Sequence, residues 1–232
     1  VSEIASLPDY QDIYGNGFHQ FPAFFFSNWG DRIDNVDVVA HPYSNFSDPS
    51  LIAAFPEFQG VDYEYRAYDN AGEFFDRGLT TQTSLGISAA TEKSSFNTTV
   101  SYVNEEGFMP NNELTRFNFG VGFNSKITDK LTVNSTLNLA LTENTAPPLG
   151  ASTGSSASGN GSAFYANVLY TPRTVDLNGL PFENPVDGRS VYYRGGNDIP
   201  NPNWIAEYTR AGSDVSRVSG KMALTYDILD NL

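Results

Sequence analysis

The stretch from Thr80 to Thr142 decides the fold, and it reads TTQTSLGISAATEKSSFNTTVSYVNEEGFMPNNELTRFNFGVGFNSKITDKLTVNSTLNLALT. Polar and apolar residues alternate along four segments of this stretch. In the third segment Phe117 and Phe119 share one face, whereas Asn118 and Asn124 share the other. Side chains on a β-strand point to opposite faces with a period of two. The pattern therefore predicts an antiparallel meander with one apolar and one polar face.

The orientation of these two faces separates two classes of protein. In a soluble β-sandwich the apolar face is the core, whereas in an outer-membrane barrel it meets lipid and the polar face lines the lumen. A tilted membrane strand needs roughly 9–11 residues, and the four segments reach that length. The polar face is rich in Asn, Ser, Thr and Gly and poor in Lys and Glu, which suits a lumen. The barrel is favoured, and a soluble carbohydrate-binding sandwich is kept as an alternative.

The connectors between the segments are alternately short and long. Thr91–Lys93 and Thr128–Lys130 are tight, polar and nearly identical, as hairpin turns are, whereas the connector from Glu105 to Leu114 is longer. Two irregular segments, 8–72 and 143–216, are longer still. Short turns at one end of a sheet and long loops at the other are typical of outer-membrane barrels. Strands are expected at residues 1–7, 79–90, 94–106, 114–127, 130–143 and 217–229.

The long irregular segments are also expected to contain short helices, one within 68–78 and one over 162–169, the latter entered from the glycine- and serine-rich tract 150–161. The chain begins inside an alternating stretch and ends just after a turn signal. We therefore expect it to be a segment of a longer protein, which places all of residues 1–232 within a single all-β barrel region.

The composition excludes some classes of protein. The chain has 27 acidic residues against 13 lysines and arginines, a net charge of −14. A nucleic-acid partner would require a basic surface, so it is not expected. Hydrophobic residues make up 40% of the chain, too many for a disordered protein. Cysteine is absent from the sequence, which excludes disulfides and thiolate chemistry.

No catalytic or metal-binding constellation is recognisable. His19 and His41 lack zinc-ligand spacing, and His41, which precedes a proline, is interpreted as a turn residue. The acidic residues of 31–37 lack the spacing and glycine of a calcium loop. Glu105 and Glu106 are expected to point to opposite faces of a strand, so they cannot act on one bond. We predict that the chain is not an enzyme and has no catalytic residue, metal site or cofactor.

Five short motifs lie within the stretch Thr80–Thr142 or just before it, namely Phe75–Gly78, Ala90–Ser94, Tyr102–Gly107, Pro110–Asn112 and Arg116–Asn118. Through these motifs the region resembles the barrel region of the SusC/RagA-type TonB-dependent transporters of Bacteroidetes. The later segment Tyr170–Trp204 is similar to the long extracellular loop of some members of that family. One departure is Ala89-Ala90, where the family often has two glycines.

The resemblance implies an all-β arc of a large transmembrane barrel in the bacterial outer membrane, about six of the family's 22 strands, that takes part in nutrient import. In the family, import is driven by TonB and assisted by a SusD-like surface lipoprotein, and the substrates are oligosaccharides or peptides. The family's plug domain and TonB box find no match in this sequence. The partners implied are therefore the lipid bilayer, the lipoprotein, TonB, the rest of the barrel and the plug, and a glycan or peptide.

Two sets of residues are candidates for contact with a substrate. The aromatic residues of the long segments are either the packing of the loops themselves or stacking platforms for a ligand, and the run Phe24–Phe26 beside Trp29 is open to both interpretations. The candidates for ligand stacking are Trp29, Tyr192, Tyr193 and Trp204. The residues expected to face the lumen are Asn97, Thr99, Arg116, Asn118, Asn124, Thr132, Asn134 and Asn138.

One alternative function remains open at this point. A surface β-barrel, similar to an adhesin, would bind a partner through its long loops without transporting it. The alternation of the strands is the same for both functions, so the strands alone do not separate transport from adhesion.

Overall fold

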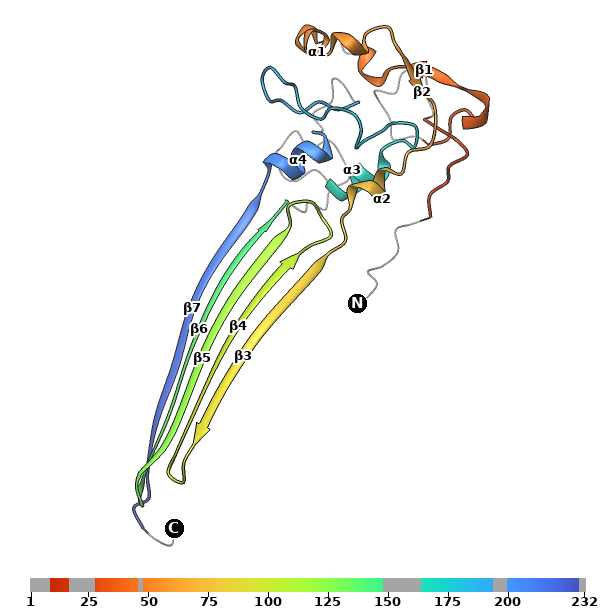
Figure 1. Cartoon of the computed structure of the whole chain (residues 1–232). Helices are drawn as coiled ribbons and strands as arrows, with labels where there is room; N and C mark the ends of the chain where they lie inside the picture. Colours follow the sequence, from red (N-terminus) through yellow and green to blue (C-terminus); the bar gives the residue numbers. More distant parts are fainter. Residues whose placement is uncertain (1–8, 17–27, 46–47, 148–163, 194–199, 230–232) are drawn as a thin grey trace. The chain divides into compact units, whose positions relative to one another are not determined.

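The computed structural model of the chain describes residues 9–16, 28–45, 48–147, 164–193 and 200–229 (Figure 1). Its secondary structure is mostly β, with two antiparallel sheets and few helices, which confirms the all-β prediction. The chain divides into two compact units. Unit 1 comprises 1–76 and 147–210, and unit 2 comprises 77–146 and 211–232.

Unit 2 is a five-stranded antiparallel sheet in which every strand pairs with its neighbour in the chain (Figure 1). The segment 147–210 separates the fourth strand from the fifth, yet these two strands also pair side by side. The strands are β3 (Leu79–Ala90), β4 (Ser94–Glu106), β5 (Glu113–Thr128), β6 (Leu131–Ala146) and β7 (Ala211–Tyr226).

The observed strands differ from the expected ones mainly at the last strand. The bounds of β3 and β4 coincide with the expected 79–90 and 94–106. Strand β7 begins at Ala211 rather than 217, because residues 211–216 continue the pairing with the end of β6 without apolar alternation. The strand expected at 1–7 and the glycine-rich tract 150–161 lie outside the described residues.

The two short turns of the sheet share one local hydrogen-bond pattern. The Thr91 hydroxyl accepts from the amide of Lys93 at 3.4 Å, and the Thr128 hydroxyl accepts from the amide of Lys130 at 3.3 Å. A threonine hydroxyl that bonds the backbone two residues later closes a turn. The longer connector between β4 and β5 instead uses a left-handed residue, Asn111, with φ of 58°.

Unit 1 consists of short elements from both long segments, which were expected to be mainly irregular. Strands β1 (Val38–Ala40) and β2 (Asp62–Glu64) pair in a small sheet that the sequence did not predict. Helices α2 (Asn70–Phe74) and α3 (Phe164–Tyr170) occupy the expected places. No described helix is long and apolar enough to cross a membrane. The remaining elements are η1 (Ile33–Asn35), η2 (Pro42–Asn45), α1 (Pro49–Ala54), η3 (Pro56–Phe58) and α4 (Pro202–Tyr208).

An aromatic cluster forms part of the core of unit 1. The ring of His41 stacks on Phe58 at a centroid distance of 4.1 Å, and Tyr43 and Tyr63 approach it edge-on. His41 is 5% exposed, so the interpretation of this histidine as a simple turn residue was incomplete. Its Nδ1 accepts the amide of Tyr43 at 3.1 Å. Burial of the ring lowers the pKa of His41 from its usual 6.5 to about 4.

Asn70, the first residue of α2, joins the two long segments that make up unit 1. Its side-chain nitrogen donates to the carbonyl oxygens of Val175 at 2.8 Å and Pro172 at 3.3 Å. Its side-chain oxygen accepts the amide of Leu177 at 2.9 Å. Because the residue is 3% exposed, these bonds are made away from water, where an unpaired amide is costly.

Replacement of Asn70 by alanine is expected to lower the free energy of unfolding of unit 1 by about 3 kcal/mol, because three backbone groups lose their partner in a buried site. Both tryptophans of the chain, Trp29 and Trp204, lie in unit 1, so urea unfolding followed by tryptophan fluorescence reports on it. The exposed Asn35→Ala is the matched control and is expected to change stability by less than about 0.5 kcal/mol. Equal stability of the two variants would contradict the role of Asn70.

The stability of unit 1 is expected to fall as the pH drops from about 6.5 towards about 4, since protonation of His41 favours the unfolded chain. Above pH 6.5 both states carry a neutral ring and this group adds no pH dependence. His41→Asn retains an acceptor and removes the titration, so its stability should vary less with pH in this range. Tryptophan fluorescence at a fixed urea concentration measures the effect. Both proteins also carry His19→Asn, so that His19 makes no contribution to the pH dependence. An unchanged pH slope would refute the assignment to His41.

Candidate functional site

The polar face of the unit 2 sheet brings together all eight residues predicted to line a lumen. The register pairs Asn97 with Gly122, and Gly122 with Thr136 on the next strand. Asn124 stands opposite Asn134 in the same face. Directly paired residues of an antiparallel sheet share one face, and so do residues two apart on a strand. The set is Asn97, Thr99, Arg116, Asn118, Asn124, Thr132, Asn134 and Asn138.

Neutral hydrogen-bonding groups cover the middle of this polar face. The side-chain nitrogen of Asn118 donates to the Ser101 hydroxyl at 3.1 Å, and the amides of Asn124 and Asn134 bond to each other. Gly122 faces the same side, and an added Cβ would lie 2.3 Å from the Asn97 amide oxygen. The glycine therefore leaves the space that the Asn97 amide occupies, and the polar groups lie close over the backbone.

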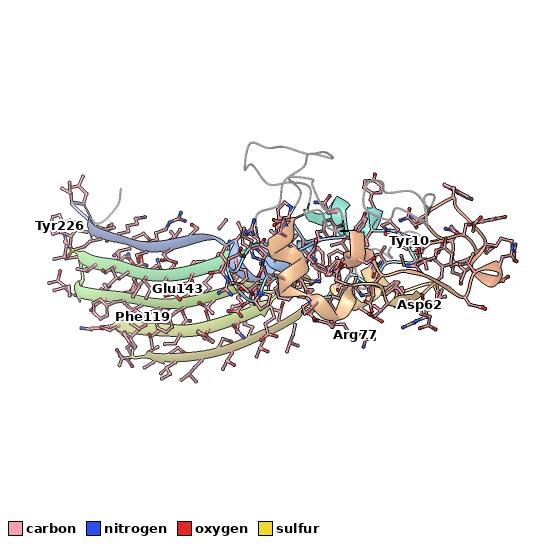
Figure 2. All side chains as sticks on the ribbon, turned by 90° about the horizontal axis from the view of Figure 1, so that it is seen from above. Tyr10, Asp62, Arg77, Phe119, Glu143 and Tyr226 are labelled. Atoms are coloured by element: carbon pink, nitrogen blue, oxygen red, sulfur yellow. The ribbon has the colours of Figure 1, made fainter. Side chains whose placement is uncertain are left out.

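The opposite face of the sheet is apolar and exposed in unit 2. Figure 2 draws the side chains of the sheet and labels Phe119 and Tyr226, which belong to this face. Phe119 lies on it, opposite Val100 on one side and Leu139 on the other. Its large side chains would be a core in a soluble sandwich, yet no described strand or helix of this unit packs against them. The most exposed include Leu85 (63%), Ile87 (55%), Val218 (69%), Met222 (71%), Leu224 (64%) and Tyr226 (62%).

Charged residues bound this apolar face and do not enter its middle. On β6 it is uncharged from Leu131 to Leu141, and Glu143 follows, directly opposite Asp214. Glu106 and Glu113 form a second pair of opposed acids at the same end. Like charges placed directly opposite each other destabilise a sheet slightly, so these two acidic pairs do not stabilise this end of the sheet. Tyr102 and Tyr226 mark the two edges of the uncharged band.

All long connections leave from this acidic end of the sheet. Leu79, the first residue of β3, pairs with Glu106, where β4 ends and the 107–112 connector begins. The segment 147–210 also begins and ends there, since Ala146 pairs with Ala211. The two short turns lie at the opposite end. The expected asymmetry of the connectors is therefore present in the sheet, and Glu105 and Glu106 face opposite sides, as expected.

Two of the four aromatic candidates are buried in unit 1. Tyr193 is 1% exposed and Tyr192 is 5% exposed, and their rings meet at a centroid distance of 4.6 Å. They line a packed region of the core together with Tyr43 and Leu177. The positions correct the prediction of ligand stacking, because neither ring presents a face to solvent. The local sequence gave no sign of this burial, because two adjacent tyrosines next to arginine and glycine are equally compatible with a buried and an exposed position.

The two tryptophans lie nearer to the surface. Trp29 is 76% exposed and its ring lies 5.8 Å from that of Tyr14. Trp204, in α4, is partly buried and donates from its indole nitrogen to the carbonyl of Gly188 at 2.9 Å. Trp29 is thus the most exposed of the four aromatic candidates. The run Phe24–Phe26 lies outside the described residues.

The described part of unit 1 contains no gathered set of metal ligands. Among the described residues of the chain, no three histidine or acidic side chains lie close enough together to hold a metal ion. Within the 31–37 segment, Asp34 instead accepts from Arg32 at 2.8 Å in an exposed ion pair. Such exposed pairs contribute little to stability.

Two residues of the polar face were not predicted from the sequence. Arg217 and Lys221 belong to it through the pairing of β7 with β6, in which Arg217 stands opposite Ala140 and Lys221 opposite Thr136. The alternation within β7 is readable, but its register against β6 is not, because 64 residues separate the two strands. Comparison of the chain with protein-family models and with curated proteins found no match.

Tyr193→Ala is expected to lower the free energy of unfolding of unit 1 by about 3 kcal/mol, as loss of a buried aromatic ring does. Trp29→Ala should change it by less than about 0.5 kcal/mol, since the ring is largely exposed. Urea unfolding followed by tryptophan fluorescence measures both variants, and Trp204 is the remaining reporter in Trp29→Ala. If Trp29→Ala destabilises unit 1 as much as Tyr193→Ala, then Trp29 is a packing residue and not an open surface.

Proposed function

We propose that this chain is an arc of a transport barrel in the bacterial outer membrane. In this proposal the apolar face of β3–β7 meets lipid and the polar face lines the path of the solute. The protein imports a glycan or peptide nutrient, takes energy from TonB and works with a SusD-like surface lipoprotein. The parts that couple to TonB and plug the barrel belong to other regions of the protein.

The observation that carries the proposal is the exposed apolar face of the sheet. Side chains such as Leu85, Val218 and Met222 are more than half exposed, and the band that contains them carries no charge. Soluble monomers rarely expose apolar patches of this kind. The uncharged run on β6, from Leu131 to Leu141, matches the roughly 9–11 residues that a tilted strand needs to cross a bilayer. Tyrosines at its edges and acidic residues beyond them suit a membrane interface.

The two edges of the sheet support a closed structure. Neither β3 nor β7 has a second neighbour among the described residues. Strand β3 contains no charged residue and no proline, so its edge lacks the devices that usually prevent edge-to-edge association. Strand β7 carries three charged residues, but it has no proline and its pairing with β6 contains no bulge. In lipid every backbone group must be paired, which a closed barrel achieves. Additional strands at both edges are therefore part of the proposal.

The motifs that resemble the SusC/RagA-type family support the transport part. The connectors agree with this resemblance, since all long segments leave from one end of the sheet, as extracellular loops do in such barrels.

Single cysteines at neighbouring positions test the membrane placement. The sequence contains no cysteine, so each introduced thiol is labelled alone. Phe119→Cys and Leu139→Cys on the apolar face are compared with Asn118→Cys and Asn138→Cys on the polar face, each in the protein reconstituted in lipid vesicles. An environment-sensitive fluorophore at 119 or 139 should emit as in an apolar medium and be quenched by nitroxide lipids. Positions 118 and 138 should react with a charged, water-soluble thiol reagent.

The paired positions serve as controls for each other, because neighbours on one strand share depth and differ only in face. Equal reaction of all four cysteines with the charged reagent would refute the membrane placement and favour a soluble sheet. Insertion with the expected labelling, but without TonB-dependent uptake of any oligosaccharide or peptide, would refute transport while keeping the barrel.

A further inference from the structure

The cationic residues of the sheet are distributed unevenly between its faces. All four lysines and arginines of β3–β7 lie on the polar face, namely Arg116, Lys126, Arg217 and Lys221. Of the five acidic residues in these strands, only Glu105 shares that face, and the other four lie at the end of the apolar face. This is a local excess of positive charge in a chain whose net charge is −14.

Three of these cations have no partner within the described residues. Lys126 lies near Asp129 at 3.7 Å. Arg116, Arg217 and Lys221 take part in no ion pair or hydrogen bond that the described structure contains, and all three side chains are exposed. Glu105 lies on the neighbouring strand β4, two residues after Val103, which pairs with Arg116. No ion pair joins Glu105 and Arg116. A cation without a partner is free to bind an anionic group.

The three free cations border one area of the polar face. Strand β6 lies between Arg116 on β5 and Arg217 on β7. Arg116 pairs with Thr142 of β6, and Arg217 pairs with Ala140, two residues away on the same strand. At the usual spacing of strands this places the Cα atoms of the two arginines about 12 Å apart. Lys221 lies four residues along β7 from Arg217, and Asn138 pairs with Ser219 between them. Asn118 and Arg217 both pair with Ala140, one from each side. Neutral hydrogen-bonding groups therefore fill the area between the charges.

We propose that this area, formed by Arg116, Arg217, Lys221, Asn118 and Asn138, binds solutes that carry carboxylate groups. The inference rests on the proposed function, because it takes the polar face as the wall of the path. Guanidinium and ammonium groups donate charge-assisted hydrogen bonds to carboxylates. The asparagine amides between them bind hydroxyl or peptide groups of the same solute. Acidic sugar oligomers and acidic peptides share this chemistry.

The position of the charges within a barrel would strengthen their effect. Charges of one sign along a cleft with low-dielectric walls raise the local concentration of counter-charged solutes. Rings of Lys and Arg select anions in other pores by the same physics. A neutral lining of asparagine and serine alone would give no such preference.

The test compares acidic and neutral forms of the same probes on the protein reconstituted in vesicles. The first probe is a galacturonic acid trimer against its methyl ester, and the second is a glutamate-containing peptide against its glutamine counterpart. Arg116→Gln, Arg217→Gln and Lys221→Gln are combined in one variant. The control combines Arg77→Gln, Lys93→Gln and Arg210→Gln, which removes three exposed charges that lie outside the strands.

Wild-type protein and the control are expected to bind at least one acidic probe about tenfold more tightly than its neutral form, with an affinity that falls as salt rises. The triple variant should lose this preference and bind the neutral forms as wild type does. Single variants should each lose part of it, which supplies the test if the triple variant does not insert. The probe that shows the preference identifies the source of the carboxylate.

Equal binding of acidic and neutral probes by wild type, an unchanged preference in the triple variant, or binding of neither acidic probe would overturn the proposal. The cysteine labels report membrane placement independently of these measurements. A correctly inserted protein without charge preference thus refutes this inference alone, whereas a protein that does not insert refutes the proposed function.

Discussion

The hydrogen-bond register of the five-stranded sheet is the constraint on which the rest of unit 2 depends. Because side chains alternate with a period of two, a slip of one residue in any pairing would move a whole strand's apolar side chains to the polar face. The threonine turns at 91 and 128 fix two of the pairings through their own hydroxyls. The separation of apolar side chains, neutral amides and charges between the faces then follows from the register.

Unit 1 depends on a different kind of interaction, in which one buried side chain joins distant parts of the chain. Asn70 bonds the backbone at 172–177, about a hundred residues away in sequence. Nearby, the Tyr43 hydroxyl donates to the carbonyl of Pro181 at 2.7 Å. Through such bonds two segments that look like separate loops in the sequence form one core, with His41 and the buried tyrosines inside it.

The sequence allowed the strands and their faces to be predicted, and gave much less information about unit 1. Alternation at 79–128 is a local signal, so the bounds of β3 and β4 and the common face of Asn97 and Arg116 followed from it. The burial of Tyr192 and Tyr193 depends on contacts with residues far away in the chain, for which the sequence contains no periodic signal. The register of β7 was hidden for the same reason, and with it the positions of Arg217 and Lys221.

Strand β3 has a further consequence for how such a protein is made. The edge of β3 that faces away from β4 pairs with no other described strand, and its residues from Leu79 to Ala90 are uncharged. During synthesis, a hairpin of β3 and β4 is therefore a template for any other strand it meets, including a second copy of itself. Any element that covers this edge, whether a strand or another part of a protein, would prevent such association.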